Sequence, residues 1–225
     1  MYRRNFLKAL LGGMVLLPLN ISAGITSLLE AAIEAGKKIP KYPDIRILGI
    51  GGRGVAIINH MIRAKFTGAH FIAADCDHDH LISSLAPTKI LLERDVRKID
   101  ISRNPTLEEE KIQKSLKGSD LVVVISGLGA GRFSGGASWV AGISKRIGCK
   151  TAAVVVKPFP FEGKRSFYFA EDEMEFLEML QIQTRVIDKN AIPYKGIPLL
   201  EVLNQTYAMA AEEVRKITAQ YLLEV

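Results

Sequence analysis

The sequence GIGGRG at residues 49–54 closes an apolar run that begins at residue 45 and opens a helical pattern that begins at residue 55. A second glycine-rich stretch, GLGAGRFSGG at residues 127–136, follows the apolar run 121–125. Glycine permits positive φ angles and lets backbone N–H groups approach an anion, and a helix that begins at such a turn adds the positive end of its dipole. Two such turns after two strands predict a phosphate site that is held from two sides.

Apolar runs alternate with helical patterns along most of the chain. We expect strands at 45–50, 69–74, 88–92, 121–125, 151–156 and 184–187, and helices at 55–65, 106–117, 137–146, 170–180 and 199–221. This alternation is typical of a parallel sheet with helices on both faces, in which ligands lie at the carboxyl ends of the strands. The sequence therefore predicts an α/β fold of three layers with a Rossmann-like parallel sheet.

Length and composition predict one domain with an N-terminal appendage. The 225 residues are 48% hydrophobic, and we expect a signal or anchor segment at 1–23, a short helix and linker at 24–43, and the domain at 44–225. The formal net charge is +6, but the chain after residue 23 carries 27 basic and 24 acidic residues, with no cluster of basic and aromatic side chains. We therefore expect no nucleic-acid partner, and the two cysteines lack the spacing of a metal site.

The first 23 residues combine Arg3, Arg4 and Lys8 with an apolar run that is short for a membrane span. This layout is typical of an export signal and resembles the bacterial twin-arginine signal. We expect either export to the periplasm or a tether at the bacterial inner membrane, with cleavage left open. The alternative is a basic amphipathic helix packed on the domain, in which case the protein is cytoplasmic.

One alternative function comes from the first turn alone. Gly49, Gly51 and Gly54 match the pattern G-x-G-x-x-G, and Asp75 lies at the end of the next expected strand. This combination is typical of the NAD- and FAD-binding fold, where the acid binds the ribose. A dinucleotide-binding oxidoreductase stays open, although the second glycine-rich stretch has no role in it and the four histidines offer no evident partner for hydride transfer.

The segment KPFPFEG at residues 157–163 makes the chain resemble the tubulin and FtsZ family of GTP-binding proteins, and the bacterial FtsZ branch in particular. Residues 45–81 resemble the opening of that domain, residues 116–163 its middle block, and residues 199–222 the start of its long central helix. The resemblance covers about two thirds of the chain. It implies a nucleotide-binding domain of the tubulin/FtsZ type, with GTP or GDP as the ligand and Mg²⁺ as a companion ion.

The resemblance also assigns nucleotide contacts to residues of both turns and of the strand ends. These are Gly51, Gly52, Arg53, Gly54, Asn59, Asp75, Asn104, Gly129, Ala130, Gly131, Arg132, Ser134, Gly135, Glu162, Asn190 and Tyr207. The second turn reads GAGRFSG at 129–135 where the family has GGGTGTG, so Phe133 places a ring where the backbone meets phosphate. Arg132 compensates in one interpretation, as a bidentate donor to phosphate. In the other interpretation the loop has lost its ligand.

The resemblance implies that hydrolysis in this family uses acids from a loop that follows the central helix, and this sequence ends near the end of that helix. We therefore expect guanine-nucleotide binding with weak or no GTPase activity, and we assign no catalytic residue. The expected role is that of a modulator or partner of filament-forming or cell-division proteins. A nucleotide-free interaction module on the same fold is the alternative, because Phe133 and Ala56 replace residues that the family uses at its ligand.

Overall fold

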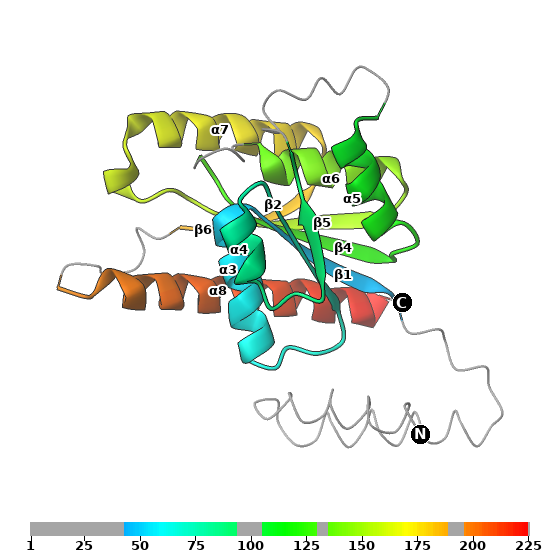
Figure 1. Ribbon diagram of the computed structural model, residues 1–225, viewed down its shortest axis with the longest axis horizontal. Coiled ribbons are helices and arrows are strands. Elements are labelled where there is room, and N and C mark those ends of the chain that lie inside the picture. The colour runs from blue at the N-terminus through cyan, green and yellow to red at the C-terminus, as the bar shows by residue number, and fades with distance from the viewer. Residues whose placement is uncertain (1–42, 94–104, 130–134, 189–195, 225) are drawn as a thin grey trace.

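The computed structural model describes residues 43–93, 105–129, 135–188 and 196–224 of the chain. Its centre is a six-stranded parallel sheet with the strand order β3-β2-β1-β4-β5-β6 (Figure 1). The strands are β1 (Ile45–Ile50), β2 (His70–Asp75), β3 (Thr88–Leu91), β4 (Leu121–Gly127), β5 (Lys150–Val156) and β6 (Gln183–Ile187). The predicted parallel α/β sheet is confirmed.

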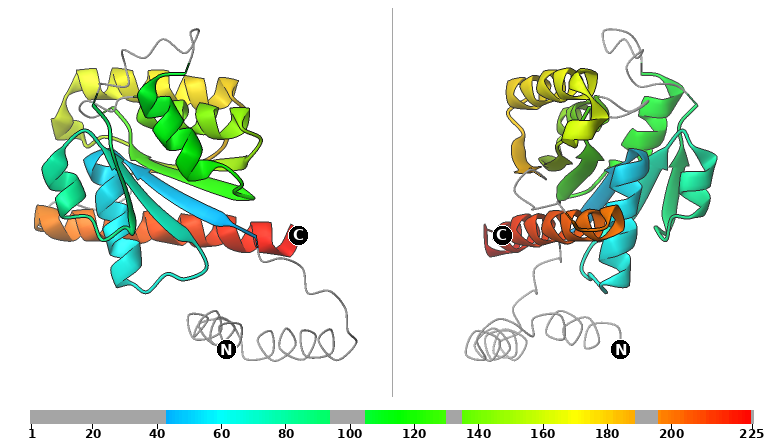
Figure 2. Two further views of the ribbon diagram at one scale, coloured as in Figure 1. Left: turned by 45° about the vertical axis from the view of Figure 1, so that its right-hand side comes forward. Right: turned by 90° about the vertical axis from the view of Figure 1, so that its left-hand side faces the viewer.

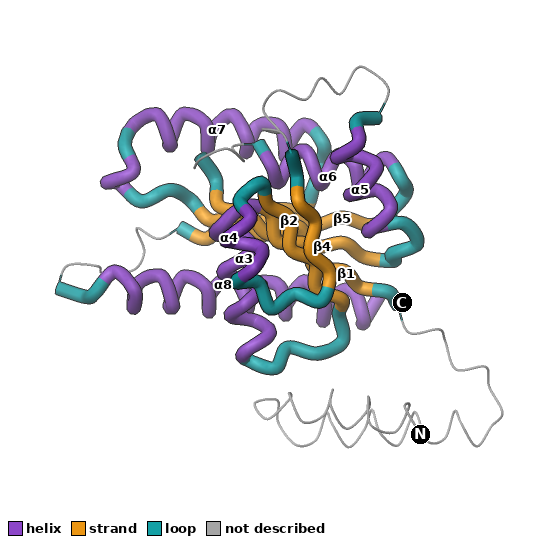
Figure 3. The backbone as a smooth tube through the Cα atoms, viewed as in Figure 1, coloured by secondary structure: helices purple, strands orange, loops and turns teal. Residues whose placement is uncertain are grey.

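Among the described residues, helices and one 3₁₀ turn follow the strands along the chain, and Figure 3 shows the helices in purple around the orange strands. They are α3 (Gly51–Arg63), α4 (His78–Ile82), α5 (Leu107–Leu116), α6 (Gly136–Arg146), η3 (Pro160–Glu162), α7 (Lys164–Met179) and α8 (Leu199–Glu224). Helices α5, α6 and α7 pack on one face of the sheet, and α3 and α8 pack on the other (Figure 2). The arrangement has the three predicted layers.

The alternation of side chains along the central strands builds two cores. In β1, Ile45 and Ile47 enter the core under α3 and α8, whereas Leu48 and Ile50 enter the core under α6 and α7. Successive side chains of a strand point to opposite faces, so a strand that is buried on both faces has to be apolar throughout. This explains why the two central strands, β1 and β4, are near-continuous apolar runs.

The strand order reverses beside β1, because the chain runs outward through β2 and β3 and then returns to place β4 on the other side of β1. The register pairs Ile50 with Ser126, so β1 and β4 end at the same level of the sheet. Crevices at such a reversal point are where open α/β sheets bind ligands. Both glycine turns follow these two strands and lie at this edge.

Two local expectations from the sequence differ from the structure. Residues 78–82 form the short helix α4, because the Asp77 side chain caps it by accepting the N–H of Asp79 at 2.9 Å. Helix α7 begins at Lys164, six residues before the expected start at residue 170. The aromatic residues in its first turns have low helix propensity, and Phe167 and Phe169 are half-buried, so their packing stabilises the helix instead.

The N-terminal expectations fall on residues 1–42, which lie outside the described residues. Among the helices that the structure describes, none is long and apolar enough to cross a membrane. The signal or anchor at 1–23 and the linker at 24–43 therefore stay predictions.

Candidate functional site

The first glycine turn presents the N-terminus of α3 to the edge of the sheet. Gly51 begins the helix with a φ of +72°, and the residue before it, Ile50, makes no capping hydrogen bond with its side chain. A Cβ at Gly54 would lie 2.6 Å from the carbonyl oxygen of Ile125 on β4, so only glycine lets the helix begin this close to the sheet. The first N–H groups of α3 therefore receive no side-chain cap from the residue that precedes the helix, a condition that favours binding of an anion.

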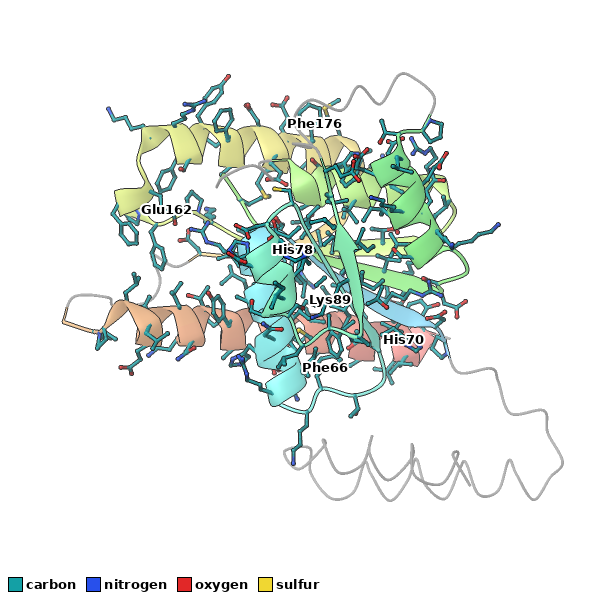
Figure 4. The ribbon with its side chains drawn as sticks, viewed as in Figure 1. Phe66, His70, His78, Lys89, Glu162 and Phe176 are labelled. Atoms are coloured by element: carbon teal, nitrogen blue, oxygen red, sulfur yellow. The ribbon has the colours of Figure 1, made fainter. Side chains whose placement is uncertain are left out.

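Arg53 extends from this turn across the end of β4. Its side chain lies on Gly127, where a Cβ would overlap the Arg53 methylenes. The Nη2 atom is 2.5 Å from Oε1 of Glu162, which lies on η3 between β5 and α7 (Figure 4). The side chains of Arg53 and Glu162 are only 22% and 15% exposed, so this ion pair is largely buried. Arg53 thus joins the first turn, β4 and η3.

One nitrogen of the Arg53 guanidinium takes no part in the ion pair with Glu162. Its Nη1 atom is buried and has no hydrogen-bond partner among the described residues. A buried unpaired donor costs about 1–3 kcal/mol, and more when the group is charged. A ligand oxygen next to Nη1 would remove that cost, so the guanidinium is suited to receive an anionic group such as phosphate.

Tyr207 on α8 lies within the electrostatic reach of the same guanidinium. Burial raises the pKa of Tyr207, and the positive charge of Arg53 opposes this shift. The ring of Tyr207 also packs edge-on against His60, with 6.4 Å between the ring centroids. The structure thus pairs Arg53 with Glu162 and places Tyr207 within the electrostatic reach of Arg53, while their contacts with a nucleotide stay predictions.

Asp75 ends β2 and is almost fully buried, with 2% of its surface exposed. Its Oδ2 atom is 2.8 Å from Nδ1 of His80, and its Oδ1 atom accepts the N–H of Asp77 at 3.0 Å. The His80 ring in turn lies against Gly52, where a Cβ would be 2.7 Å from the ring. Asp75 therefore supports the first turn through His80, a residue to which the sequence analysis assigned no role.

The second glycine turn is described only at its two ends. Gly129 has a φ of +68°, and a Cβ there would overlap the carbonyl oxygen of Ser166 in the first turn of α7. Gly135 has a φ of +94° and precedes α6. Six predicted contact residues lie outside the described residues, namely Ala130, Gly131, Arg132, Ser134, Asn104 and Asn190. Their contacts with a nucleotide stay predictions.

The N-terminus of α6 carries a carboxylate that the sequence analysis missed. Oε1 of Glu173 on α7 accepts the N–H of Ala137 at 2.8 Å, while Oε2 is buried without a hydrogen-bond partner among the described residues. Burial raises the pKa of Glu173 to about 7, although the backbone N–H groups of Gly135, Ala137 and Ser138 favour the charged form. The signal in the sequence was an acid between Ala170 and Leu177, on the buried stripe of an amphipathic helix.

Asn59, a predicted nucleotide contact, makes its hydrogen bonds away from the first glycine turn. Its Nδ2 atom donates to the carbonyl oxygen of Ser83 at 3.1 Å, and its Oδ1 atom accepts the N–H of Leu85 at 2.7 Å. These bonds tie α3 to the segment between α4 and β3, two helical turns beyond the glycine turn. Asn59 is not grouped with Arg53, Glu162 and Tyr207.

The described edge therefore fits a phosphate group better than it fits a metal ion. The helix terminus without a side-chain cap, the glycine contacts and the unpaired Nη1 of Arg53 all suit phosphate oxygens. Within the described ranges, no three His, Cys, Asp or Glu side chains gather closely enough to hold a metal ion.

Comparison with known proteins identifies relatives of the chain. Residues 44–192 match the family model described as Tubulin/FtsZ family, GTPase domain. The cell division protein FtsZ of Pseudomonas putida is 33% identical over 152 residues, which cover 64% of this chain and 38% of that protein. FtsZ of Pseudomonas aeruginosa is 34% identical over 152 residues, covering 64% of this chain and 39% of that protein. The chain thus spans about two fifths of the length of these curated relatives.

Solved structures show the same fold. An FtsZ variant from M. jannaschii superimposes with a TM-score of 0.65 at 29% identity, covering 86% of this chain and 59% of that chain. An FtsZ dimer from M. jannaschii, described as empty, gives a TM-score of 0.64 at 26% identity, covering 85% of this chain and 57% of that chain. CetZ from Methanosaeta thermophila shares the fold with a TM-score of 0.60 at 15% identity, over 79% of this chain and 54% of that chain.

Proposed function

Because the chain belongs to the Tubulin/FtsZ family as a GTPase domain, we propose that it binds a guanine nucleotide, GTP or GDP, at the edge formed by β1 and β4. The observation that carries the proposal is the buried Nη1 of Arg53, which has no hydrogen-bond partner in the described part of the chain and lies beside the Arg53–Glu162 ion pair. A phosphate oxygen supplies the missing acceptor. The N–H groups at the start of α3 supply further donors to the same group.

Each grouped residue receives a role in this proposal. Arg53 and the turn at Gly51 bind phosphate, Glu162 accepts a hydrogen bond from a ribose hydroxyl, and Tyr207 lies against the base. Glu162 is able to pair with Arg53 and to accept from a ribose at the same time, since a carboxylate offers about four acceptor positions. Within the described ranges no group of acids is placed to hold Mg²⁺, so the proposal assigns that ion no role.

We propose weak or absent hydrolysis, on the basis of what the acids at this edge already do. Asp75 is engaged by His80 and Asp77, Glu162 by Arg53, and Glu173 by the N-terminus of α6. Hydrolysis of a γ-phosphate requires a group that positions the attacking water. We therefore propose that the edge formed by β1 and β4 binds the nucleotide but accelerates its hydrolysis little. A phosphate-release assay with GTP tests this.

The biological role that we propose is modulation of, or partnership with, filament-forming or cell-division proteins. Its support is that the matched relatives are named as cell division proteins and that one matched structure is a dimer of FtsZ. For residues 1–23 we propose a twin-arginine-type signal or membrane tether. Fractionation of cells that produce the protein, with and without these residues, tests the location.

The binding proposal is tested by titrating the purified chain with fluorescently labelled GDP and then displacing the label with unlabelled GTP, GDP or ATP. We expect binding in the micromolar range, displacement by both guanine nucleotides, and little displacement by ATP. An Arg63→Ala variant is the matched control, because Arg63 is an exposed arginine in the last turn of the same helix. Absence of binding at millimolar nucleotide would contradict the proposal.

A second candidate is a nucleotide-free interaction module, and one observation favours it. Two positively charged features at this edge already have internal anions, since Glu162 pairs with Arg53 and Glu173 accepts from the start of α6. Under this alternative the two carboxylates replace the ligand. A nucleotide that co-purifies with the chain would exclude it.

A further inference from the structure

Glu173 is a buried acid at the end of the second glycine turn. Its side chain is almost wholly buried, with the residue 1% exposed, and it reaches from the middle of α7 to the first turn of α6. Oε1 accepts the N–H of Ala137, but Oε2 is buried and has no partner among the described residues. A carboxylate next to a helix N-terminus is favourable, whereas a buried carboxylate oxygen without a donor is not. The group therefore lies close to the balance between its charged and neutral forms.

Helix α7 also connects Glu173 to the proposed phosphate site. The helix begins directly after Glu162, and the carbonyl oxygen of Ser166 in its first turn packs on Gly129 of the second glycine turn. That same turn runs from Gly127, which lies under Arg53, to Gly135, which precedes α6. A phosphate held at Arg53 and a carboxylate held at α6 thus lie at the two ends of one glycine turn.

A negatively charged ligand at this turn favours the protonated form of Glu173. A phosphate group at Arg53 and the start of α3 adds negative charge at one end of this turn, and it repels the buried carboxylate at the other end. A carboxyl group that takes up a proton removes this repulsion. The neutral carboxyl group still accepts the N–H of Ala137 through Oε1, and it carries the proton on the oxygen that has no donor.

We propose that binding of a phosphate-bearing nucleotide is coupled to the uptake of one proton by Glu173. The proton comes from solvent and is carried on Oε2, and no other bond is made or broken. This coupling rests on the proposed nucleotide binding and adds its regulation: the affinity for nucleotide rises as the pH falls. The protein thereby links the occupancy of its site to pH.

Among the charged residues on α6 and α7, we assign the proton uptake to Glu173. On α6, Lys145 and Arg146 lie in the last turn, where they contact the carbonyl oxygen of Leu180 and the carboxylate of Glu109. On α7 itself, the adjacent Asp172 is half-buried and Glu175 is exposed. Burial and backbone N–H groups set the pKa of Glu173 near 7, with no contribution from a charged side chain of the described residues. Arg132 lies outside those residues.

The test measures protons as well as affinity, on the full-length protein with GDP as the probe. Calorimetric titrations at pH 7 in two buffers of different ionisation enthalpy give the number of protons taken up. We expect the wild type to take up about half a proton more than Glu173→Gln, because about half of the Glu173 carboxyls are already protonated at pH 7 in the unliganded protein. We also expect the wild type to lose about tenfold more affinity than the variant between pH 6 and pH 8.

Three features keep the test interpretable. The terminal phosphate of the nucleotide titrates near pH 6, so the comparison is made between variants and not between pH values alone. Glu175→Gln on the same helix is the matched control and should behave as the wild type. Carboxyl ¹³C chemical shifts of wild-type Glu173 provide a measurement without any substitution, and they should report a higher pKa when GDP is present.

The possible results separate the two proposals. A proton uptake that is present in the wild type and reduced in Glu173→Gln supports the coupling. Equal proton uptake in both proteins, together with an unchanged Glu173 pKa on GDP binding, overturns the coupling and leaves nucleotide binding intact. Failure of both proteins to bind GDP at any pH overturns the proposed function and the coupling with it.

Discussion

Arg53 on α3 and Glu162 on η3 form an ion pair of 2.5 Å across the end of β4. Arg53 places a charged side chain in a glycine-rich turn. Gly127 leaves room for that side chain, because a Cβ at Gly127 would overlap the Arg53 methylenes. An arginine is planar and keeps its charge when buried, so it can hold one carboxylate and one phosphate at the same time. This relationship is why we assign phosphate binding to the first turn.

Replacing Arg53 tests that assignment. We expect Arg53→Ala to weaken GDP binding by about 10- to 100-fold, the equivalent of a lost charge-assisted hydrogen bond. Arg53→Lys should lie between the wild type and the alanine variant, because lysine keeps the charge but not the fork of donors. Titration calorimetry measures the affinities, with Arg63→Ala as the control. Wild-type affinity in Arg53→Ala would contradict the role of Arg53.

Gly129 should be intolerant of a side chain. We expect Gly129→Ala to lower the free energy of unfolding by about 3 kcal/mol, because alanine disfavours the φ of +68° and its Cβ overlaps Ser166. The control is Gly148→Ala, where φ is +85° but no atom lies within 4 Å of the added Cβ. That variant should lose only about 1 kcal/mol. Equal losses in urea unfolding would show that the second turn does not pack on α7 as described.

Dinucleotides should not bind. Asp75 is only 2% exposed and contacts His80 and the N–H of Asp77, so burial keeps a ribose from reaching its carboxylate. We therefore expect no change in NADH fluorescence on addition of the protein, up to millimolar cofactor. Binding of NADH that is lost in Asp75→Asn would reverse this interpretation and revive the oxidoreductase alternative.

The stability of the unliganded protein should fall with rising pH because of Glu173. Its pKa is about 7 in the fold and near 4.5 in the unfolded chain, so the folded state binds more protons between these values. Stability is then greatest below about pH 4.5 for this group, declines through about pH 7, and is constant above it. The total loss is about 3 kcal/mol.

Glu173→Gln isolates this contribution. The amide oxygen of glutamine is able to accept the N–H of Ala137 without carrying charge, so we expect the variant to lack this decline and to exceed the wild type in stability at pH 8. Urea unfolding at pH 5 and pH 8 gives the comparison. Parallel pH dependence in both proteins would show that Glu173 is already ionised in the fold at neutral pH.

The sheet was predictable from the sequence because its evidence is local. The strand β1 is a largely apolar run followed by glycine, and β4 is one that ends in glycine, so the same stretch of sequence indicates both the buried strand and the turn. The short helix α4 escaped prediction, since five mostly polar residues carry no periodic signal and its start depends on one cap from Asp77. Local patterns thus gave the layers and the edge but not every element at that edge.

The contacts at the sheet edge were harder to predict than the residues that lie there. The resemblance named Arg53, Glu162 and Tyr207; the structure pairs the first two and places Tyr207 within the electrostatic reach of Arg53, and their nucleotide contacts stay predictions. The contacts of Asp75 with His80 and of Glu173 with Ala137 depend on how elements pack, which the spacing of residues does not record. The opposite holds for Asn59. An asparagine is suited to contact a ligand, but in the fold the Asn59 amide bonds the backbone of Ser83 and Leu85.

The most direct test of nucleotide binding is to denature the purified full-length protein and identify by chromatography any small molecule that it releases. We predict GDP or GTP, held by the turn at Gly51 and by Arg53. An empty protein that also fails to bind added GTP would contradict the account and favour the nucleotide-free interaction module. Release of NAD or FAD would contradict it in the other direction, by assigning the first turn to a dinucleotide.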